Sequence, residues 1–504
     1  MRIGDLMVQS GVQFGTSGAR GLAVDMTDRV CYAYTLGFLQ YCARIGVLPP
    51  GGELALAGDY RPSTDSILAA CAQAAADSGY LPRYLGHIPS PAVAAFGMAR
   101  GLPSLMVTGS HIPDDRNGIK FNLPRGEILK ADEAGIRAES VELPGGHFTA
   151  AGAFHPQAAR PLPPEDPGGY RAYVARYLDF FPADCLAGLD IGLYEHSSVA
   201  REAFFEVLTG LGARVDRLGR SDTFIPVDTE AIRPEDVRLG KAWAATGRYQ
   251  TLLSADGDGD RPLVADEHGD WLRGDITGIL CARYLGAEAV AAPVSCNSAL
   301  EKSGWFRAIR RTRIGSPYVI EGMTDLAAAG LSPVVGYEAN GGFLIATDLV
   351  REGRHLPALP TRDALVVAIA LLLAAQERGL TLSALARGLP PRFTASDRLK
   401  DFPTELAQGR LQPLASGAAS RDLAAAESLF GALFGPVSAI DITDGVRVTF
   451  ASGEIAHLRP SGNAPELRAY TEADSLERAW EMNRQCLALL ASWRAGQTNE
   501  YEGD

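Results

Sequence analysis

The feature that most constrains the fold of this chain is a repeated alternation of short apolar runs with stretches of helical periodicity. One cycle covers residues 54–107, a second covers residues 189–218, and a third covers residues 289–313. Such alternation is typical of βαβ units, in which crossover helices join parallel strands. The pattern therefore predicts three successive α/β units as the core of the chain.

Stretches rich in proline and glycine divide the chain between these units. Residues 155–169 contain five prolines, which neither a helix nor a central strand tolerates. Glycines punctuate residues 269–274, and residues 388–391 follow a long apolar helix expected from Asp363. The remainder is of mixed character and predicts a smaller α+β domain. The expected domains are residues 1–162, 163–270, 271–389 and 390–504.

Charge and composition narrow the partners. The chain has 47 Lys and Arg residues against 60 Asp and Glu residues, a formal net charge of −13. A negative chain repels polyphosphate at long range, so neither nucleic acid nor an anionic membrane is expected as a partner. A small anionic substrate needs only a local cluster of arginine and lysine and stays compatible with this charge. We expect a monomer or a homodimer.

The apolar segments and the cysteines favour a cytoplasmic protein. The longest apolar run, residues 364–375, is too short to span a bilayer, and the first thirty residues show no secretory signal pattern. The seven cysteines are scattered and include no CxxC pair. This usage predicts reduced, mostly buried thiols and neither a disulfide framework nor a zinc site.

The segment Asp256-Gly257-Asp258-Gly259-Asp260-Arg261 follows a strand-like run. Three carboxylates at alternate positions, separated by glycines that let the backbone curl, can converge on one hard cation such as Mg²⁺. A calcium-binding EF-hand loop is excluded, because Arg261 stands at the position where that loop needs glycine and Pro262 follows it. A solvated acidic turn is the alternative.

The segment from Thr108 to Lys120 begins where another apolar strand ends. The carboxyl ends of parallel strands are where open α/β sheets bind their ligands. Ser110 is the candidate nucleophile, and Lys120, on a loop that folds back, is placed to exchange protons with a hydroxyl group. By itself the segment also fits a polar turn.

Two later segments offer groups that bind sugars and phosphates. The glycine-rich stretch 336–342 contains Glu338 and Asn340, which can bond vicinal hydroxyls, although a simple tight turn would read the same. Residues 459–465, with Arg468 shortly after, combine arginines, a hydroxyl, an amide and a glycine. They suit a phosphate ester, with a solvated surface turn as the alternative, and the sequence has no Walker A pattern for a nucleoside triphosphate.

In this order and spacing the four segments resemble the four signature loops of the α-D-phosphohexomutases, the phosphomannomutase and phosphoglucomutase superfamily. The stretch 14–21, FGTSGARG, is similar to the opening motif of that family, and residues 58–63 extend the resemblance. It implies four domains around a central cleft, three of them similar mixed α/β domains and the last a smaller α+β domain. It also implies an intramolecular phosphotransferase with Mg²⁺ and a hexose 1,6-bisphosphate activator.

The resemblance implies a role for each loop. Ser110 would carry a phosphoryl group and, with the three aspartates, contact the metal. The implied catalytic residues are Ser110, Lys120, Arg20, His111 and Arg261, and the implied metal ligands are Ser110, Asp256, Asp258 and Asp260. The implied sugar-binding residues are Gly336, Glu338 and Asn340, and the implied phosphate-binding residues are Arg459, Ser461, Gly462, Asn463 and Arg468.

Several positions depart from the family pattern. Gly109 stands where alanine is usual, and Ile112 where asparagine is usual. The common sugar loop ends in histidine, where this chain has Gly342, and the phosphate loop has Asn463-Ala464 in place of Thr-Glu. The expected activity is that of a phosphomannomutase, with phosphoglucomutase as an additional activity. The alternatives are a phosphoglucosamine mutase and a sugar-phosphate-binding protein without catalysis.

Overall fold

The computed structural model describes residues 1–15, 18–461 and 465–498 of the chain. By its internal contacts the chain forms two compact units. The first combines Met1–Ala291 with Gly315–Ala386, and the second combines Ala292–Ile314 with the chain from Arg387 onward. Both units mix helices with sheets, which confirms the predicted α/β class. None of the described helices is long and apolar enough to cross a membrane.

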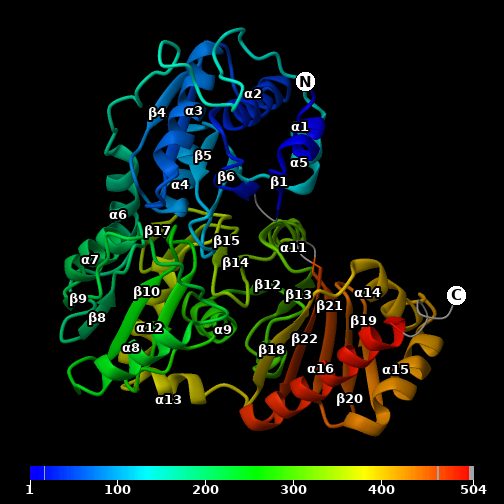
Figure 1. Ribbon diagram of the computed structural model, residues 1–504. Helices are drawn as coiled ribbons and strands as arrows, with labels where there is room; N and C mark the ends of the chain where they lie inside the picture. Colours follow the sequence, from blue (N-terminus) through cyan, green and yellow to red (C-terminus); the bar gives the residue numbers. More distant parts are fainter. Residues whose placement is uncertain (16–17, 462–464, 499–504) are drawn as a thin grey trace, which may run out of the picture. The chain divides into compact units, whose positions relative to one another are not determined.

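The first unit begins with a seven-stranded mixed sheet of strand order β1-β2-β6-β5-β3-β4, to which β7 adds by pairing with β6 (Figure 1). Strand β3 lies between β5 and β4 and is parallel to both, as the first predicted βαβ cycle requires. Its elements in chain order are α1 (Ile3–Ser10), β1 (Gln13–Phe14), β2 (Ala19–Leu22), α2 (Asp28–Arg44), β3 (Glu53–Gly58), α3 (Thr64–Asp77), β4 (Leu81–Tyr84), α4 (Ser90–Arg100), β5 (Ser104–Val107), β6 (Arg116–Leu123), β7 (Gly126–Glu127) and α5 (Lys130–Ala138).

One expectation about this sheet is wrong. Lys120 does not lie on a folded-back loop, because β6 is a strand in which Lys120 pairs with Met106 of β5. The sequence reading took this segment for a loop because Asp, Asn and Gly residues precede and open it, although Ile119, Phe121 and Leu123 alternate as buried apolar residues of a strand do. The pairing fixes the Lys120 backbone beside the strand that leads into the serine loop.

The first unit holds two further sheets. One has the strand order β11-β10-β8-β9, and in the other β12, β14 and β15 pair in that order. The elements, with the small β16–β17 hairpin, are α6 (Gly168–Phe180), β8 (Asp190–Tyr194), α7 (Arg201–Gly210), β9 (Arg214–Leu218), α8 (Pro234–Ala244), β10 (Thr251–Ala255), β11 (Pro262–Ala265), α9 (Gly274–Tyr284), β12 (Ala289–Pro293), α11 (Ser316–Ala328), β14 (Val334–Tyr337), β15 (Phe343–Ile345), β16 (Leu349–Arg351), β17 (Arg354–Leu356), α12 (Ala364–Gln376) and α13 (Leu382–Arg387). The apolar helix expected from Asp363 is α12, and Asp363 caps it by accepting a hydrogen bond from Leu365 N.

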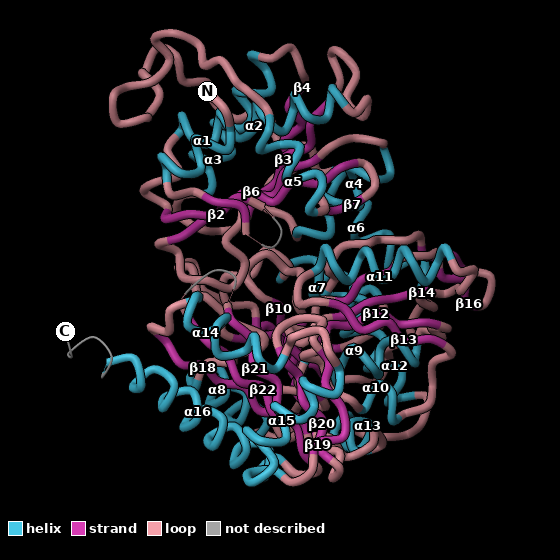
Figure 2. The backbone as a smooth tube through the Cα atoms, turned by 90° about the vertical axis from the view of Figure 1, so that its right-hand side faces the viewer, coloured by secondary structure: helices cyan, strands magenta, loops and turns pink. Residues whose placement is uncertain are grey.

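The second unit is dominated by a five-stranded antiparallel sheet of order β18-β22-β21-β20-β19. Figure 2 shows α16 lying along this sheet, and it packs on β18 and β22. The sequence predicted two of these five strands and the C-terminal helix. The elements are α10 (Ala299–Lys302), β13 (Ala308–Thr312), β18 (Phe393–Lys400), α14 (Thr404–Leu411), the 3₁₀ turn Gln412–Leu414, α15 (Ala419–Phe434), β19 (Val437–Asp441), β20 (Val446–Phe450), β21 (Ile455–Pro460), β22 (Glu466–Ala473) and α16 (Leu476–Thr498).

Candidate active site

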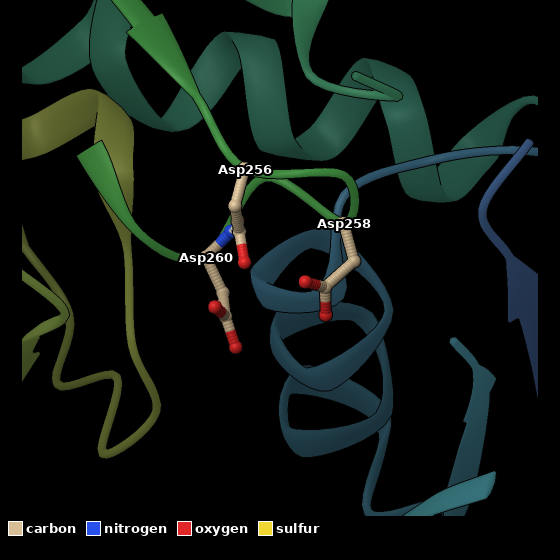
Figure 3. Close-up of side chains that lie close together, drawn as sticks. All are labelled: Asp256, Asp258 and Asp260. Atoms are coloured by element: carbon tan, nitrogen blue, oxygen red, sulfur yellow. Dashed lines mark hydrogen bonds between the residues drawn. The ribbon is translucent and has the colours of Figure 1, made fainter. Parts of the chain in front are cut away.

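The acidic loop follows β10, and its three aspartates converge. Figure 3 shows the carboxylates of Asp256, Asp258 and Asp260 on the same side of the loop. One oxygen from each lies within 4.8 Å of the others, and all three side chains are buried. Gly259 has a φ of 71°, a left-handed conformation that allows the tight curl between the second and third aspartates.

The individual oxygens of the loop fit a cation. Oδ2 of Asp258 accepts hydrogen bonds from Lys120 Nζ at 2.6 Å and from Ser90 Oγ at 2.5 Å. Oδ2 of Asp260 accepts from Lys120 Nζ, also at 2.5 Å. The Oδ1 atoms of both residues are buried and have no hydrogen-bond partner in the described part of the chain. Two orphaned carboxylate oxygens in a buried acidic cluster are the donor set that Mg²⁺ prefers.

The serine loop reaches this cluster. Ser110 Oγ donates a hydrogen bond to Asp256 Oδ2 at 2.6 Å, and Ser110 N donates to Thr108 Oγ1 at 2.7 Å. Ser110 has a φ of 57°, in the left-handed region that costs a non-glycine residue about 1 to 2 kcal/mol. The loop therefore holds the serine hydroxyl against the acidic loop in a backbone conformation that its surroundings must impose.

Arg61 imposes that conformation. Its guanidinium donates to the carbonyl oxygens of Ser110 (2.8 Å), Ile112 (2.6 Å), Pro113 (2.8 Å) and Arg116 (3.2 Å). Its Nε pairs with Asp59 Oδ2 at 3.1 Å, and both side chains are fully buried. A planar fork of this kind matches several carbonyls at once, which a lysine does not.

The same arginine accounts for the glycine at position 109. A Cβ added to Gly109 would lie 2.6 Å from Arg61 Cζ and 2.8 Å from its Nε, closer than real Cβ contacts. A side chain at position 109 would therefore have to displace the guanidinium that holds the loop, and glycine avoids this displacement.

Charges around the cluster shift its titration. Burial and the neighbouring carboxylates of Asp258 and Asp260 raise the pKa of Asp256 well above its ordinary value. Burial would also raise the pKa of Asp260, but Arg362 and Lys120 outweigh it and lower that pKa. Burial would lower the pKa of Lys120, but Asp258 and then Asp260 outweigh it, so the pKa of Lys120 rises. Lys120 is therefore an ammonium at neutral pH.

The remaining candidate catalytic residues border the serine and the acidic loop. His111 Nδ1 lies 3.3 Å from Ser110 Oγ, and burial followed by the charge of Arg261 lowers the pKa of His111 to about 3. The imidazole is therefore neutral at physiological pH. Arg261 Nε lies 3.9 Å from Asp256 Oδ2. Burial, with Arg261 next in weight, lowers the pKa of Arg20 to about 10, so this side chain remains a cation.

The predicted sugar loop is buried and tied to its neighbours. Arg362 Nη1 donates to Glu338 Oε2 at 3.1 Å, and Thr229 Oγ1 donates to the Asn340 carbonyl at 2.6 Å. Asn340 Oδ1 accepts from Gly342 N at 2.9 Å, which closes the turn. Gly336 lies in β14, where a Cβ would meet Val319 Cγ1 of α11 at 2.5 Å, so the strand packs closely on that helix here. Its contact with the sugar stays a prediction.

The predicted phosphate loop lies in the second unit. Arg459 and Arg468 face each other across β21 and β22, so both project from the same face of the sheet at the base of the loop. Ser461 N donates to the Glu466 carbonyl at 2.8 Å and closes the hairpin. Gly462 and Asn463 lie outside the described residues.

Sequence reasoning missed the two buried arginines of this site, Arg61 and Arg362. Arg61 belonged to a stretch that resembles the family, but no role followed from the motif alone. Arg362 stands in the polar stretch 361–363 directly before the apolar helix α12. A charged residue at the entrance of a fully buried helix was the available signal, because such a charge must find a partner inside the fold.

Comparison with known proteins identifies the family. The models of phosphoglucomutase/phosphomannomutase alpha/beta/alpha domain I, alpha/beta/alpha domain III and the C-terminal domain match residues 11–142, 273–393 and 406–487. The phosphomannomutase of Salmonella muenchen is 42% identical over 488 residues, which cover 97% of each chain. The chain belongs to the phosphoglucomutase/phosphomannomutase family.

More distant members agree with this assignment. The phosphoglucosamine mutase of Deinococcus deserti is 28% identical over 77% of this chain and 84% of its own length. The crystal structure of a phosphoglucomutase/phosphomannomutase family protein from Burkholderia thailandensis superposes with a TM-score of 0.70 at 19% identity. That match covers 94% of this chain and 97% of the other. The fold of the family thus extends over nearly the whole chain.

Proposed function

We propose that this member of the phosphoglucomutase/phosphomannomutase family interconverts hexose 1-phosphates and hexose 6-phosphates, with mannose as the preferred sugar and glucose as a second substrate. The observation that carries the proposal is the 2.6 Å hydrogen bond from Ser110 Oγ to Asp256 Oδ2. It joins a strained serine to a buried acidic triplet, the two parts that a phosphoserine mechanism requires. The choice of mannose rests on the similarity to the Salmonella muenchen phosphomannomutase.

In the proposed phosphoryl transfer, one bond to phosphorus forms as another breaks, and one proton moves between the two oxygens. A sugar hydroxyl oxygen forms a bond to phosphorus while the bond from phosphorus to Ser110 Oγ breaks. The hydroxyl loses one proton, and Ser110 Oγ gains one. We assign the relay to Lys120, which gives its ammonium proton to the departing oxygen and takes the proton of the attacking hydroxyl. The bound hexose 1,6-bisphosphate then reverses its orientation in the site and returns its other phosphoryl group to Ser110.

The acidic loop fits Mg²⁺. Asp256, Asp258 and Asp260 would hold the ion, which when bound supplies charge neutralisation for the phosphoryl oxygens. Arg261 is a second, permanent cation beside the same loop. The like-charged carboxylates that raise the pKa of Asp256 are the reason that a dication suits this place.

Binding of the substrate is divided between loops. We assign Glu338 and Asn340 to the sugar hydroxyls, and Arg459, Ser461, Gly462, Asn463 and Arg468 to the phosphate that does not react. Two arginines projecting from one sheet face suit the bidentate grip of a phosphate ester. Binding energy from that remote phosphate would orient the reacting end of the sugar.

The test is conversion of mannose, glucose and glucosamine 1-phosphates, run in parallel with Mg²⁺ and a trace of hexose 1,6-bisphosphate. We expect mannose 1-phosphate to turn over fastest, and the Ser110→Ala variant to lose nearly all activity. Ser66→Ala, which removes an exposed hydroxyl on α3, is the matched control and keeps full activity. Mass spectrometry after incubation with the bisphosphate should find the phosphoryl group on the peptide that contains Ser110.

Three results would contradict the proposal. Faster conversion of glucosamine 1-phosphate would make the protein a phosphoglucosamine mutase. Binding of all three sugars without conversion would make it a sugar-phosphate-binding protein. Full activity of Ser110→Ala would refute the phosphoserine mechanism.

A further inference from the structure

Arg362 connects two of the loops described above without belonging to either. Its side chain is 3% exposed, and its Nε donates to Asp260 Oδ2 at 3.0 Å. Its Nη1 donates to Glu338 Oε2 at 3.1 Å. One guanidinium thus bridges a carboxylate of the acidic loop and the carboxylate of the sugar loop.

The stem of Arg362 fills the place of a missing side chain. A Cβ added to Gly342 would lie 2.4 Å from Arg362 Cδ and 2.5 Å from its Cγ, distances that real Cβ atoms essentially never show. The φ of Gly342 lies outside the left-handed region, so its backbone conformation is open to any residue. Packing against Arg362 is therefore the reason for glycine at position 342.

The support of Arg362 is rigid. Its neighbour Asp363 donates from its backbone N to the Phe343 carbonyl at 2.9 Å, which ties this segment to β15. The Asp363 carboxylate caps α12 and accepts from Tyr173 Oη at 2.9 Å, and Tyr177 Oη donates to its other oxygen. An arginine that projects from such an anchored turn holds its fork in a fixed place.

The bridge leaves one oxygen of Asp260 for a cation. Arg362 and Lys120 both donate to Oδ2, while the buried Oδ1 of Asp260 has no hydrogen-bond partner among the described residues. On the other side, Arg362 holds one oxygen of Glu338. The two donors therefore orient Asp260, and Arg362 connects that orientation to the sugar loop.

We propose that Arg362 is a positioning residue that holds Glu338 of the sugar loop in place for the substrate. Its stem occupies the volume that a side chain at position 342 would fill. The common loop of the family has histidine at that position, and here the filling side chain comes from residue 362. A guanidinium keeps its proton at all physiological pH values, so Arg362 acts through geometry and charge and not through proton transfer. The role toward substrate rests on the proposed function.

The first experiment tests the packing and is independent of activity. Gly342→Ala should lower the thermal midpoint in the wild-type background, because the methyl group meets the stem of Arg362. In the Arg362→Ala background the same substitution should cost little or nothing, since the space is then free. Gly145→Ala is the matched control, because a Cβ there meets nothing within 4 Å. Equal costs of Gly342→Ala in both backgrounds would overturn the packing argument.

The second experiment tests the positioning role by measuring the affinity for mannose 1-phosphate with calorimetry. All proteins carry Ser110→Ala, so that they do not convert the ligand during the measurement. Arg362→Ala should weaken binding by about tenfold or more, because it leaves the buried Glu338 carboxylate untethered. Arg351 lies on β16 and pairs with Glu377, so Arg351→Met is a control that should leave the affinity unchanged. The swap of Gly342→His with Arg362→Ala should recover part of the lost affinity, since an imidazole then fills the vacated volume.

The outcomes distinguish a failure of the proposed function from a failure of the positioning role of Arg362. If the wild type neither converts nor binds any hexose phosphate, the proposed function fails. The melting comparison still tests the packing of Gly342 against Arg362. If wild type is active but Arg362→Ala binds substrate as Arg351→Met does, the positioning role is refuted and the function stands. A swap that binds no better than Arg362→Ala alone would show that the two side chains do not exchange places.

Discussion

The substitution Arg61→Lys tests whether one buried guanidinium holds the reactive serine in place. Lysine keeps the charge and can still pair with Asp59, so the buried carboxylate is not abandoned. What it loses is the planar fork that donates to four carbonyl oxygens of the serine loop. The variant therefore isolates geometry from charge.

The structure sets the size of the effect. A single ammonium reaches at most about two of the four carbonyls, so at least two charge-assisted hydrogen bonds disappear, each worth about 1.5 to 3 kcal/mol. The loss is therefore about 3 to 6 kcal/mol, and relaxation of Ser110 from its φ of 57° favours the disordered loop by a further 1 to 2 kcal/mol or so. About 3 kcal/mol alone corresponds to a population change of more than about a hundredfold.

We expect kcat to fall by about a hundredfold or more, with KM changed much less, because the guanidinium of Arg61 holds the loop that carries the reactive serine. The assay is 1-phosphate to 6-phosphate conversion, together with hydrogen exchange of the amides of residues 109–112, which should exchange faster. Arg44→Lys is the control, since Arg44 is 54% exposed and pairs only at the surface with Glu139. A kcat within about threefold of wild type and unchanged exchange of the amides of residues 109–112 would refute the reasoning.

Four further predictions follow from other buried groups. Lys120→Met should destabilise the protein by about 3 to 5 kcal/mol, because two buried carboxylates lose their shared cation, and added Mg²⁺ should restore part of the lost thermal midpoint. In the wild type, Mg²⁺ should raise the midpoint with concentration and a chelator should lower it, as ligand linkage requires; a midpoint indifferent to both would exclude the metal site. Burial tends to raise the pKa of Glu267, but the hydrogen bond from the Ser383 hydroxyl leads the effects that lower it to about 2. Because the pKa of Glu267 is lower in the folded protein, the ionised Glu267 contributes its full stabilisation above about pH 4.3 and loses it as the pH falls toward 2. The difference in thermal midpoint between the wild type and Ser383→Ala should therefore narrow over that pH range. Tyr177→Phe should cost about 1 to 3 kcal/mol by chemical denaturation, because the buried Asp363 cap loses one of its two tyrosine partners.

The sequence predicted the elements whose signal is local. The strands expected at residues 54–58, 105–107 and 214–218 are β3, β5 and β9, and the apolar run after Asp363 is α12. The helix expected near Ser298 is only the four residues Ala299–Lys302, because Gly304 leaves the helix with a φ of 64°. Apolar periodicity finds where an element lies, but a nearby glycine can end it early.

The parts of the site that the sequence missed depend on distant contacts. β6 carries a local apolar alternation at Ile119, Phe121 and Leu123, but its polar side chains are buried through partners elsewhere in the fold, such as Lys120 with Asp258. Arg362 bonds Asp260, 102 positions away in the sequence, and Arg61 bonds the Ser110 carbonyl, 49 positions away. The loops that carry reactive groups were visible as motifs, whereas the partners of the two arginines were not, because those partners lie far away in the sequence.

The two glycine and arginine pairs, 109 with 61 and 342 with 362, make the order of evolutionary change matter. In each pair a side chain on the glycine and the present pose of the arginine exclude each other. In a variant library built on this sequence, alanine at position 109 or 342 should cost less stability in members whose partner arginine has already been shortened. Substitution scans made one residue at a time would therefore overstate how strictly each position requires glycine, because that cost depends on whether the arginine is present.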